Sequence, residues 1–245
     1  MTLVQRRPRR KIVAPPTAPG PIEGERLATA LAALAASDAD LARAIAEVGP
    51  PPPRSRPAGF ASLLDIVLAQ QVSTASFRAI AGRLVAAIGV VTPAGILSLS
   101  ETELRAVGFS RQKTIYARGI AEAVAEGRLD LDAVARLDDE AAVAELVKLK
   151  GVGRWTAEIY LMFCLARPDI LPAGDLALCE AARLVKRKRR RPDEAALRRM
   201  GRPWQPWRSV ASRLLWHYYA VKVRRAVAPL PAAADETQPA VESNG

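Results

Sequence analysis

The sequence is poor in the side chains that build most metal and redox centres. Its 245 residues include two cysteines and one histidine. Cys164 and Cys179 are too few for a disulfide scaffold, a four-cysteine zinc site or an iron–sulfur cluster within this chain. A multi-histidine metal centre and a Cys-His or Ser-His triad are disfavoured as well, because His217 stands alone. We therefore predict that the protein works without a cofactor.

Long apolar runs are also missing. None reaches the roughly 18 residues that a membrane-spanning helix needs. The basic segment 1–11 has no apolar stretch behind it, so it is not typical of a secretory signal. We expect a cytoplasmic protein, in the cytosol or nucleoid of a bacterial-type cell, that does not bind membranes.

Positive charge is what the sequence has in excess. Lys and Arg number 36 against 25 Asp and Glu, which gives a formal net charge of +11. Residues 1–22 hold five of the bases and no acid, whereas residues 226–245 hold three acids and no base. The segment between them is therefore basic in its own right. Such a balance favours a polyanionic partner, nucleic acid first and an anionic membrane second.

The residue pattern between the two termini is helical. Ala, Leu and Arg dominate, and apolar residues recur at helical rather than strand spacing. Polar residues such as those at Thr92-Pro93 and Ser100-Glu101 indicate helix starts. We predict an all-α protein of about ten helices. The Pro-rich segment 1–22 and the segment 226–245 are predicted to be disordered.

The segment with the clearest chemical meaning is Gly151-Val152-Gly153, which joins two predicted helices. Two glycines around one apolar residue allow a tight turn and let backbone N–H groups approach an anion. The second helix adds its free N–H groups and the positive end of its dipole. The residues expected to hold a nucleic-acid backbone by its phosphates are Lys148, Lys150, Gly151, Val152, Gly153, Arg154 and Thr156. A bare Gly-x-Gly is more often a helix C-cap and an ordinary turn, but the basic and apolar flanks favour the phosphate site.

An aspartate follows the second glycine at a useful spacing. One helix and a short loop separate Gly153 from Asp175, so the chain can return to the mouth of the hairpin. A carboxylate there would face a sugar of bound DNA. The alternative is that Asp175 only N-caps the helix that begins at Leu176. The two roles are compatible, because a helix N-terminus favours a negative charge.

Three segments together resemble the helix–hairpin–helix DNA glycosylase superfamily, and within it the alkylation-repair branch of 3-methyladenine DNA glycosylase II. They are Gly151-Val152-Gly153 with Trp155-Thr156-Ala157, Pro172 and Asp175; Leu68-Ala69-Gln70-Gln71-Val72-Ser73; and Trp204-Gln205-Pro206-Trp207-Arg208-Ser209. The resemblance implies an all-α, two-lobed fold with DNA bound between the lobes. The implied domains are a discontinuous first lobe formed by 23–59 with 169–225, and a helical-bundle lobe at 60–168 that ends in the helix–hairpin–helix.

The resemblance implies an enzyme that flips a damaged base out of duplex DNA and hydrolyses its N-glycosidic bond. Asp175 matches the catalytic carboxylate, and Gln71 matches a residue that wedges into the gap left by the flipped base. Trp155 and Trp204 match aromatic positions of the base pocket. Trp155 also occupies the position at which strand-nicking members have a lysine, so no lyase activity is expected. The carbonyls that match those holding an alkali-metal ion in the family are those of Val147, Leu149 and Val152.

The implied substrate is an alkylated base, 3-methyladenine foremost, in double-stranded DNA, and the protein is expected to be a monomer. Gly174 and Leu176 replace an acidic and an aromatic residue of the family, so the substrate range stays open. The alternatives are a glycosylase for oxidised or mismatched bases and a non-catalytic DNA-binding protein. The basic run from Lys186 to Arg191 either contacts phosphates or forms a solvated surface.

Overall fold

The structure is a computed structural model that describes residues 20–223. The two segments predicted to be disordered, 1–22 and 226–245, lie outside this range except for residues 20–22. Ile22 is buried, and its carbonyl accepts a hydrogen bond of 2.8 Å from Arg213 Nη1. Ile22 therefore belongs to the folded body, because an apolar contact and a hydrogen bond both hold it.

Residues 20–223 form helices and no strand, which confirms the predicted all-α class. The helices are α1 (Gly24–Ser37), α2 (Ala39–Val48), α3 (Phe60–Leu68), α4 (Thr74–Ile88), α5 (Pro93–Ser98), α6 (Glu101–Val107), α7 (Arg111–Ala125), α8 (Leu131–Arg136), α9 (Asp139–Leu146), α10 (Arg154–Phe163), α11 (Leu176–Val185), α12 (Glu194–Met200) and α13 (Arg208–Val223), with a 3-10 helix at Arg202–Trp204. None of them combines the length and the apolar character that crossing a membrane requires.

Short polar side chains set most of the helix starts. A Ser, Thr or Asp at the N-cap accepts a backbone N–H of the first turn in α2, α4 to α9, α11 and α12. Helices α1, α3 and α10 lack such a cap, and the N-cap of α10, like that of α3, is a glycine, Gly153, which has no side chain to accept the bond. The N–H groups in the first turn of α10 are therefore open to a ligand.

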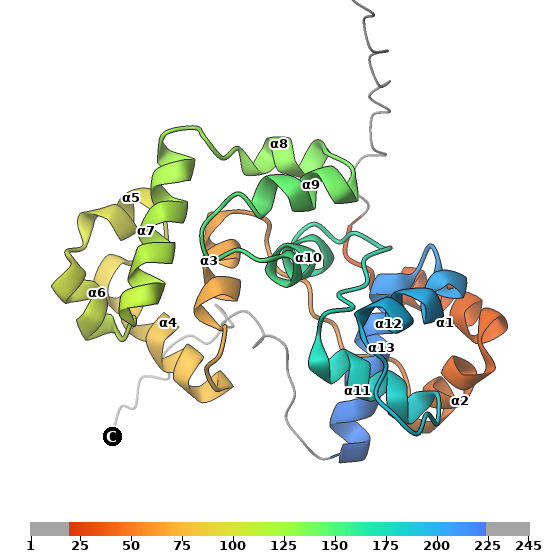
Figure 1. The fold of residues 1–245 in the computed structure, drawn as a ribbon. Helices are drawn as coiled ribbons and strands as arrows, with labels where there is room; N and C mark the ends of the chain where they lie inside the picture. The colour runs from red at the N-terminus through yellow and green to blue at the C-terminus, as the bar shows by residue number, and fades with distance from the viewer. Residues whose placement is uncertain (1–19, 224–245) are drawn as a thin grey trace, which may run out of the picture.

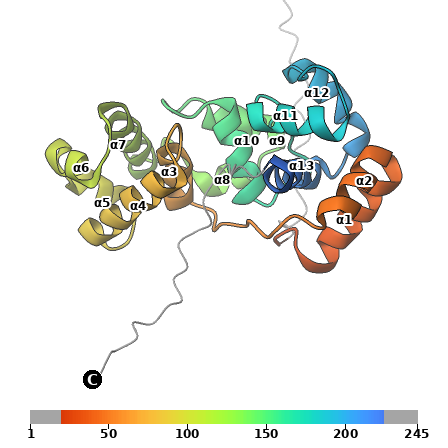
Figure 2. The same cartoon turned by 90° about the horizontal axis from the view of Figure 1, so that it is seen from below.

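The helices form two groups that share one apolar core (Figure 1). The central lobe consists of α3 to α10, and the terminal lobe consists of α1, α2, α11, α12, α13 and the 3-10 helix. Both views place α10 between α3 and the terminal lobe (Figure 2). The chain thus starts in the terminal lobe, builds the central lobe and returns after α10. This return brings the segment before α11 back toward the start of α10.

Candidate active site

The turn between α9 and α10 depends on its two glycines in different ways. Gly151 has a φ of +92°, and a Cβ atom there would lie 2.3 Å from the ring of Tyr116. Gly153 has an ordinary φ of −84°, and a Cβ atom there would meet nothing within 4 Å. Between them, Val152 is buried and anchors the turn. The fold therefore requires a glycine at position 151. It does not require one at position 153, where the backbone faces open space.

The predicted phosphate ligands around this turn divide into exposed and buried groups. Lys148 and Lys150 are exposed beside it. Thr156 is buried, and its Oγ1 accepts a 2.8 Å hydrogen bond from Gln70 Nε2. Thr156 can therefore offer an anion its backbone N–H, at the third position of α10, but not its hydroxyl.

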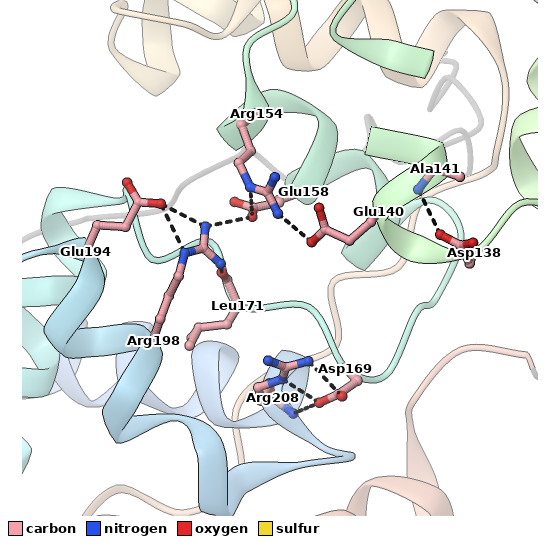
Figure 3. A network of polar contacts seen from close by, with 10 residues as sticks. All are labelled: Asp138, Glu140, Ala141, Arg154, Glu158, Asp169, Leu171, Glu194, Arg198 and Arg208. Carbon is pink, nitrogen blue, oxygen red and sulfur yellow. Dashed lines mark hydrogen bonds and ion pairs between the residues drawn. The ribbon is translucent and has the colours of Figure 1, made fainter. Parts of the chain in front are cut away.

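Arg154 is held by the protein itself (Figure 3). Its guanidinium bonds Glu140 Oε1 on α9 at 2.6 Å and Glu158 Oε1 on α10 at 3.0 Å. Burial raises the pKa of Glu158, and Arg198 on α12 opposes that shift by bonding the same oxygen at 3.2 Å. The network joins both helices of the hairpin to the terminal lobe. The charge of Arg154, which we predicted to contact DNA, is thus largely compensated inside the hairpin.

Asp175 lies at the head of α11, in a loop whose backbone is pinned. Its own N–H bonds the Pro172 carbonyl at 2.9 Å, and Cys179 Sγ donates to the Ala173 carbonyl at 3.3 Å. The Asp175 Oδ1 atom accepts the Leu178 N–H at 2.7 Å, so the side chain does cap α11. The residues on either side, Gly174 and Leu176, are exposed. The carboxylate therefore has a fixed direction and an open neighbourhood.

Two tryptophans from different helices bond this carboxylate. Trp155, the second residue of α10, donates its Nε1–H to Asp175 Oδ2 at 2.9 Å. Trp216 on α13 donates its Nε1–H to Asp175 Oδ1 at 3.3 Å. Trp216 is buried and its ring stacks on Phe163, with 6.2 Å between the ring centroids. All three donors to Asp175 are thus neutral N–H groups, and one of them comes from the residue two places after Gly153.

Trp204 lies elsewhere, which corrects its predicted place in the base pocket. Its ring is 0% exposed, and its Nε1–H bonds Asp38 Oδ2 at 2.7 Å. Asp38 also bonds Lys186, the residue after the end of α11. Trp204 is therefore at the opposite end of α11 from Asp175, about 15 Å away at 1.5 Å per residue. Trp216 is the tryptophan of the C-terminal segment that reaches Asp175.

The turn between α3 and α4 lies beside the hairpin. Gln70 donates to the Gly151 carbonyl at 3.2 Å as well as to Thr156. Gln71 is exposed and has a left-handed φ of +57°, which is uncommon for a residue with a Cβ. The Gln-Gln pair thus supplies one side chain that braces the hairpin and one that points away from the core. Sequence reasoning singled out Gln71 and missed the bracing role of Gln70.

The hairpin carbonyls of Val147, Leu149 and Val152 are the groups that the resemblance assigns to an alkali-metal ion. Within residues 20–223, no cluster of three or more His, Cys, Asp or Glu side chains could hold a metal ion. The Leu149 carbonyl accepts the Val152 N–H at 3.1 Å, and no described backbone N–H is bonded to the carbonyls of Val147 and Val152. These oxygens fit an alkali-metal ion, which stays a prediction.

Comparison with known proteins agrees with this geometry. The family model of HhH-GPD superfamily base excision DNA repair proteins matches residues 64–206. The chain is 31% identical over 161 residues to DNA-3-methyladenine glycosylase 1 of Schizosaccharomyces pombe, covering 64% of this chain and 71% of that protein. The solved structure of 3-methyladenine DNA glycosylase Mag1 from the same yeast in complex with abasic DNA superposes with a TM-score of 0.69 at 29% identity, covering 77% of this chain and 95% of that one.

The chain belongs to the HhH-GPD superfamily of base excision DNA repair proteins. The predicted resemblance and the helix–hairpin–helix fold are thereby confirmed. A DNA-3-methyladenine glycosylase of Bacillus subtilis is 31% identical over 121 residues, which cover 49% of this chain and 40% of that protein. The chain spans less than half the length of the two Bacillus subtilis relatives that it matches.

Proposed function

We propose that this protein is a monofunctional DNA glycosylase that hydrolyses the N-glycosidic bond of alkylated bases, 3-methyladenine foremost, in duplex DNA. The observation that carries the proposal is the hydrogen bond from Trp155 to Asp175. This bond joins the Asp175 carboxylate to the first turn of α10, the helix that follows the glycine turn. A phosphate held at that turn would bring its own deoxyribose next to the carboxylate. The proposed state is a monomer, acting in the cytoplasm.

The chemistry asked of Asp175 is electrostatic. When the bond between C1′ and the base nitrogen breaks, its electron pair leaves with the base and positive charge develops on the sugar. A carboxylate beside C1′ stabilises that charge and orients the water that then adds to C1′ and gives up a proton. Three N–H donors fix the Asp175 oxygens before the reaction begins. Preorganisation of this kind lowers the barrier because no dipoles need to turn during the step.

Trp155 supports both the proposed absence of lyase activity and the proposed preference for alkylated bases. An indole at its position cannot form a Schiff base with the sugar, so water is the acceptor and the strand is left intact. Its half-buried ring also lies directly beside the carboxylate. An aromatic face attracts a flat, cationic base such as 3-methyladenine by stacking and cation–π interaction. The printed names of the Schizosaccharomyces pombe and Bacillus subtilis relatives point to the same class of substrate.

The deciding experiment measures free bases released from methylated duplex DNA under single-turnover conditions. We expect the wild type to release 3-methyladenine without cutting the strand. Asp175→Asn keeps the size of the side chain and its capping ability but removes the charge, so the rate should fall by about 10³-fold or more. Asp130→Asn is the matched control, since Asp130 caps α8 in the same way through the Ala133 N–H. It should leave the rate unchanged.

Three outcomes would contradict the proposal. Equal release by wild type and Asp175→Asn would remove the carboxylate from the mechanism. Release of oxidised but not methylated bases would show that the substrates are oxidised rather than alkylated bases. DNA binding with no release of any base would leave a non-catalytic DNA-binding protein.

The two hairpin glycines give a second test. Gly153→Asp places a negative side chain where no protein atom competes for the space, so the fold should hold while affinity for all DNA sequences falls alike. Gly151→Ala should instead lower the melting temperature, because its Cβ would overlap the Tyr116 ring. Melting curves of each variant protein report its stability, and fluorescence anisotropy with two unrelated DNA duplexes reports its affinity for DNA. A Gly153→Asp protein with unchanged affinity would argue against phosphate binding at the turn.

A further inference from the structure

The segment after α11 carries a dense positive charge that the site described above does not use. Arg187, Lys188, Arg189, Arg190 and Arg191, called here the basic loop, are all exposed. None of them takes part in an ion pair or a side-chain hydrogen bond found among residues 20–223. Lys186, by contrast, bonds Asp38 and Asp40 at 2.6 and 3.3 Å. The run therefore divides into one lysine that anchors the end of α11 and five cations that are left to solvent.

Arg187 has a left-handed backbone conformation, which is unfavourable for a residue with a Cβ atom. The N–H of Arg187 bonds the Leu184 carbonyl, and the N–H of Lys188 bonds the Arg183 carbonyl. This is the Schellman ending of a helix, in which the left-handed position is normally glycine. Arg187 occupies it with a φ of +49°. A residue with a Cβ pays for that conformation in stability.

The same ending occurs at α6 with the usual residue. Gly108 takes the left-handed position with a φ of +108°, and the following N–H, from Phe109, bonds the Leu104 carbonyl. An arginine at the helix end has a modest compensation, since it faces the negative end of the dipole. That attraction applies to one or two cations near the last turn and does not account for five in succession.

The basic loop runs back along α11 toward Asp175. The hydrogen bond from Arg183 is the main cause that lowers the pKa of Glu180 on α11, and the charge of Arg191 adds to it, which agrees with a position of Arg191 near this helix. The next helix, α12, starts at Glu194, whose Oε2 is 3.6 Å from the place where a Cβ on Gly174 would be. The basic loop thus begins at the Lys186 end of α11, and the segment that follows it, 192–194, returns to the residue before Asp175.

We infer that the basic loop is a second phosphate-binding surface, which holds the DNA backbone on the terminal-lobe side of the active site. This inference rests on the proposed function for its substrate. The length of α11, about 15 Å at 1.5 Å per residue, corresponds to roughly four base pairs at 3.4 Å per nucleotide of one strand. The hairpin would hold the strand at the reacting nucleotide, and the basic loop would hold the duplex a few base pairs away.

Binding of the full-length protein to duplex DNA tests the inference. The duplex contains a tetrahydrofuran abasic analogue, and affinity is measured across a series of salt concentrations. Arg189→Gln/Arg190→Gln should weaken binding roughly tenfold at 0.1 M salt and lower the slope of log K against log salt by about 1 to 2. Base release at saturating enzyme should be unchanged, because neither arginine touches Asp175. The matched control is Arg128→Gln/Arg136→Gln, which removes two exposed arginines around α8, at the opposite edge of the molecule from α11 (Figure 1).

A second variant distinguishes binding from helix capping. Arg187→Gly should raise the melting temperature by about 2–4 °C, since glycine relieves the left-handed strain, while DNA affinity falls. An unchanged affinity in both loop variants, or an equal loss in the control, would overturn the inference. If the loop variants keep their DNA affinity but lose binding to phosphatidylglycerol vesicles, a membrane surface replaces DNA as the partner. A wild type that binds the duplex but releases no base would refute the glycosylase proposal and leave this binding result standing.

Discussion

The two aspartates at the ends of α11 have nearly the same chemistry and different surroundings. Asp38 caps α2 and accepts an indole N–H from Trp204. Asp175 caps α11 and accepts indole N–H groups from Trp155 and Trp216. Asp38, however, has Lys186 at 2.6 Å, and its side chain is only 7% exposed. Asp175 has neutral donors alone and exposed residues on both sides.

The comparison shows how the surroundings of a carboxylate with a structural role differ from those of the carboxylate that we propose as catalytic. Lys186 compensates the charge of Asp38, and little of the Asp38 side chain is exposed. Asp175 has no lysine or arginine among its partners in residues 20–223, and its chain neighbours are exposed, as the proposed stabilisation of a cationic sugar requires. A hydrogen bond from a tryptophan does not distinguish the two carboxylates, because both Asp38 and Asp175 accept one.

The largest effect that sharpens the comparison is expected from Asp38→Asn. The substitution leaves the partly buried Lys186 without its main partner, so the free energy of unfolding should fall by about 2–3 kcal/mol. Single-turnover base release at 20 °C should be unchanged for the folded fraction. Urea unfolding followed by tryptophan fluorescence gives the first quantity. If a fully folded Asp38→Asn protein lost base release, Asp38 would not be purely structural and the contrast with Asp175 would be wrong.

A smaller effect is expected from the paired tryptophan variants. Trp216→Phe keeps the stacking on Phe163 but removes a donor to Asp175, and a bond to a charged acceptor of about 1.5 kcal/mol corresponds to a tenfold lower single-turnover rate. Trp204→Phe should lower stability by a similar amount and leave the rate unchanged. Rates and unfolding curves of both proteins provide the check, and identical profiles for the two variants would contradict the assignment.

The smallest expected effect is a dependence of stability on acid. Burial alone would raise the pKa of Asp38, but hydrogen bonds from Lys186 and Trp204 outweigh it and hold the pKa below its ordinary 3.8. The stability that these contacts contribute is therefore complete above pH 3.8 and is lost as the pH falls through the lowered value. The stability difference between wild type and Asp38→Asn should be constant near neutrality and shrink below about pH 4. Thermal melts of both proteins from pH 7 to pH 2.5 measure this difference. A difference that grows in acid would contradict the lowered pKa of Asp38.

Local signals in the sequence predicted much of this molecule. The glycine turn, the capping residues and the spacing from Gly153 to Asp175 depend on neighbouring residues, so they predict the hairpin and the return of the carboxylate. Helices α8 and α12, at six and seven residues, are too short to show a periodic pattern, and they were missed although the equally short α5 and α6 were predicted from their N-cap residues. The aspartate caps of α8 and α12 were the available signal.

The tryptophans and Arg154 show what local signals cannot supply. Trp204 and Trp216 lie in one segment, and only the packing of α13 between α2 and α11 decides which of them meets Asp175. Arg154 carried a positive charge next to the glycine turn, but Glu140 on the preceding helix takes up one side of its guanidinium. The other partner, Glu158, is four residues further along α10, a spacing at which helical side chains meet.

The bond from Trp216 to Asp175 spans 41 residues of sequence, and this has a consequence for how the protein is made. A nascent chain that has emerged only through α11 already contains the glycine turn and the carboxylate. It lacks α13, so the Trp216 indole that bonds the carboxylate is synthesised after both of them. If Asp175 acts as we propose, full preorganisation of its carboxylate would therefore require the synthesis of α13, after the glycine turn has already been made.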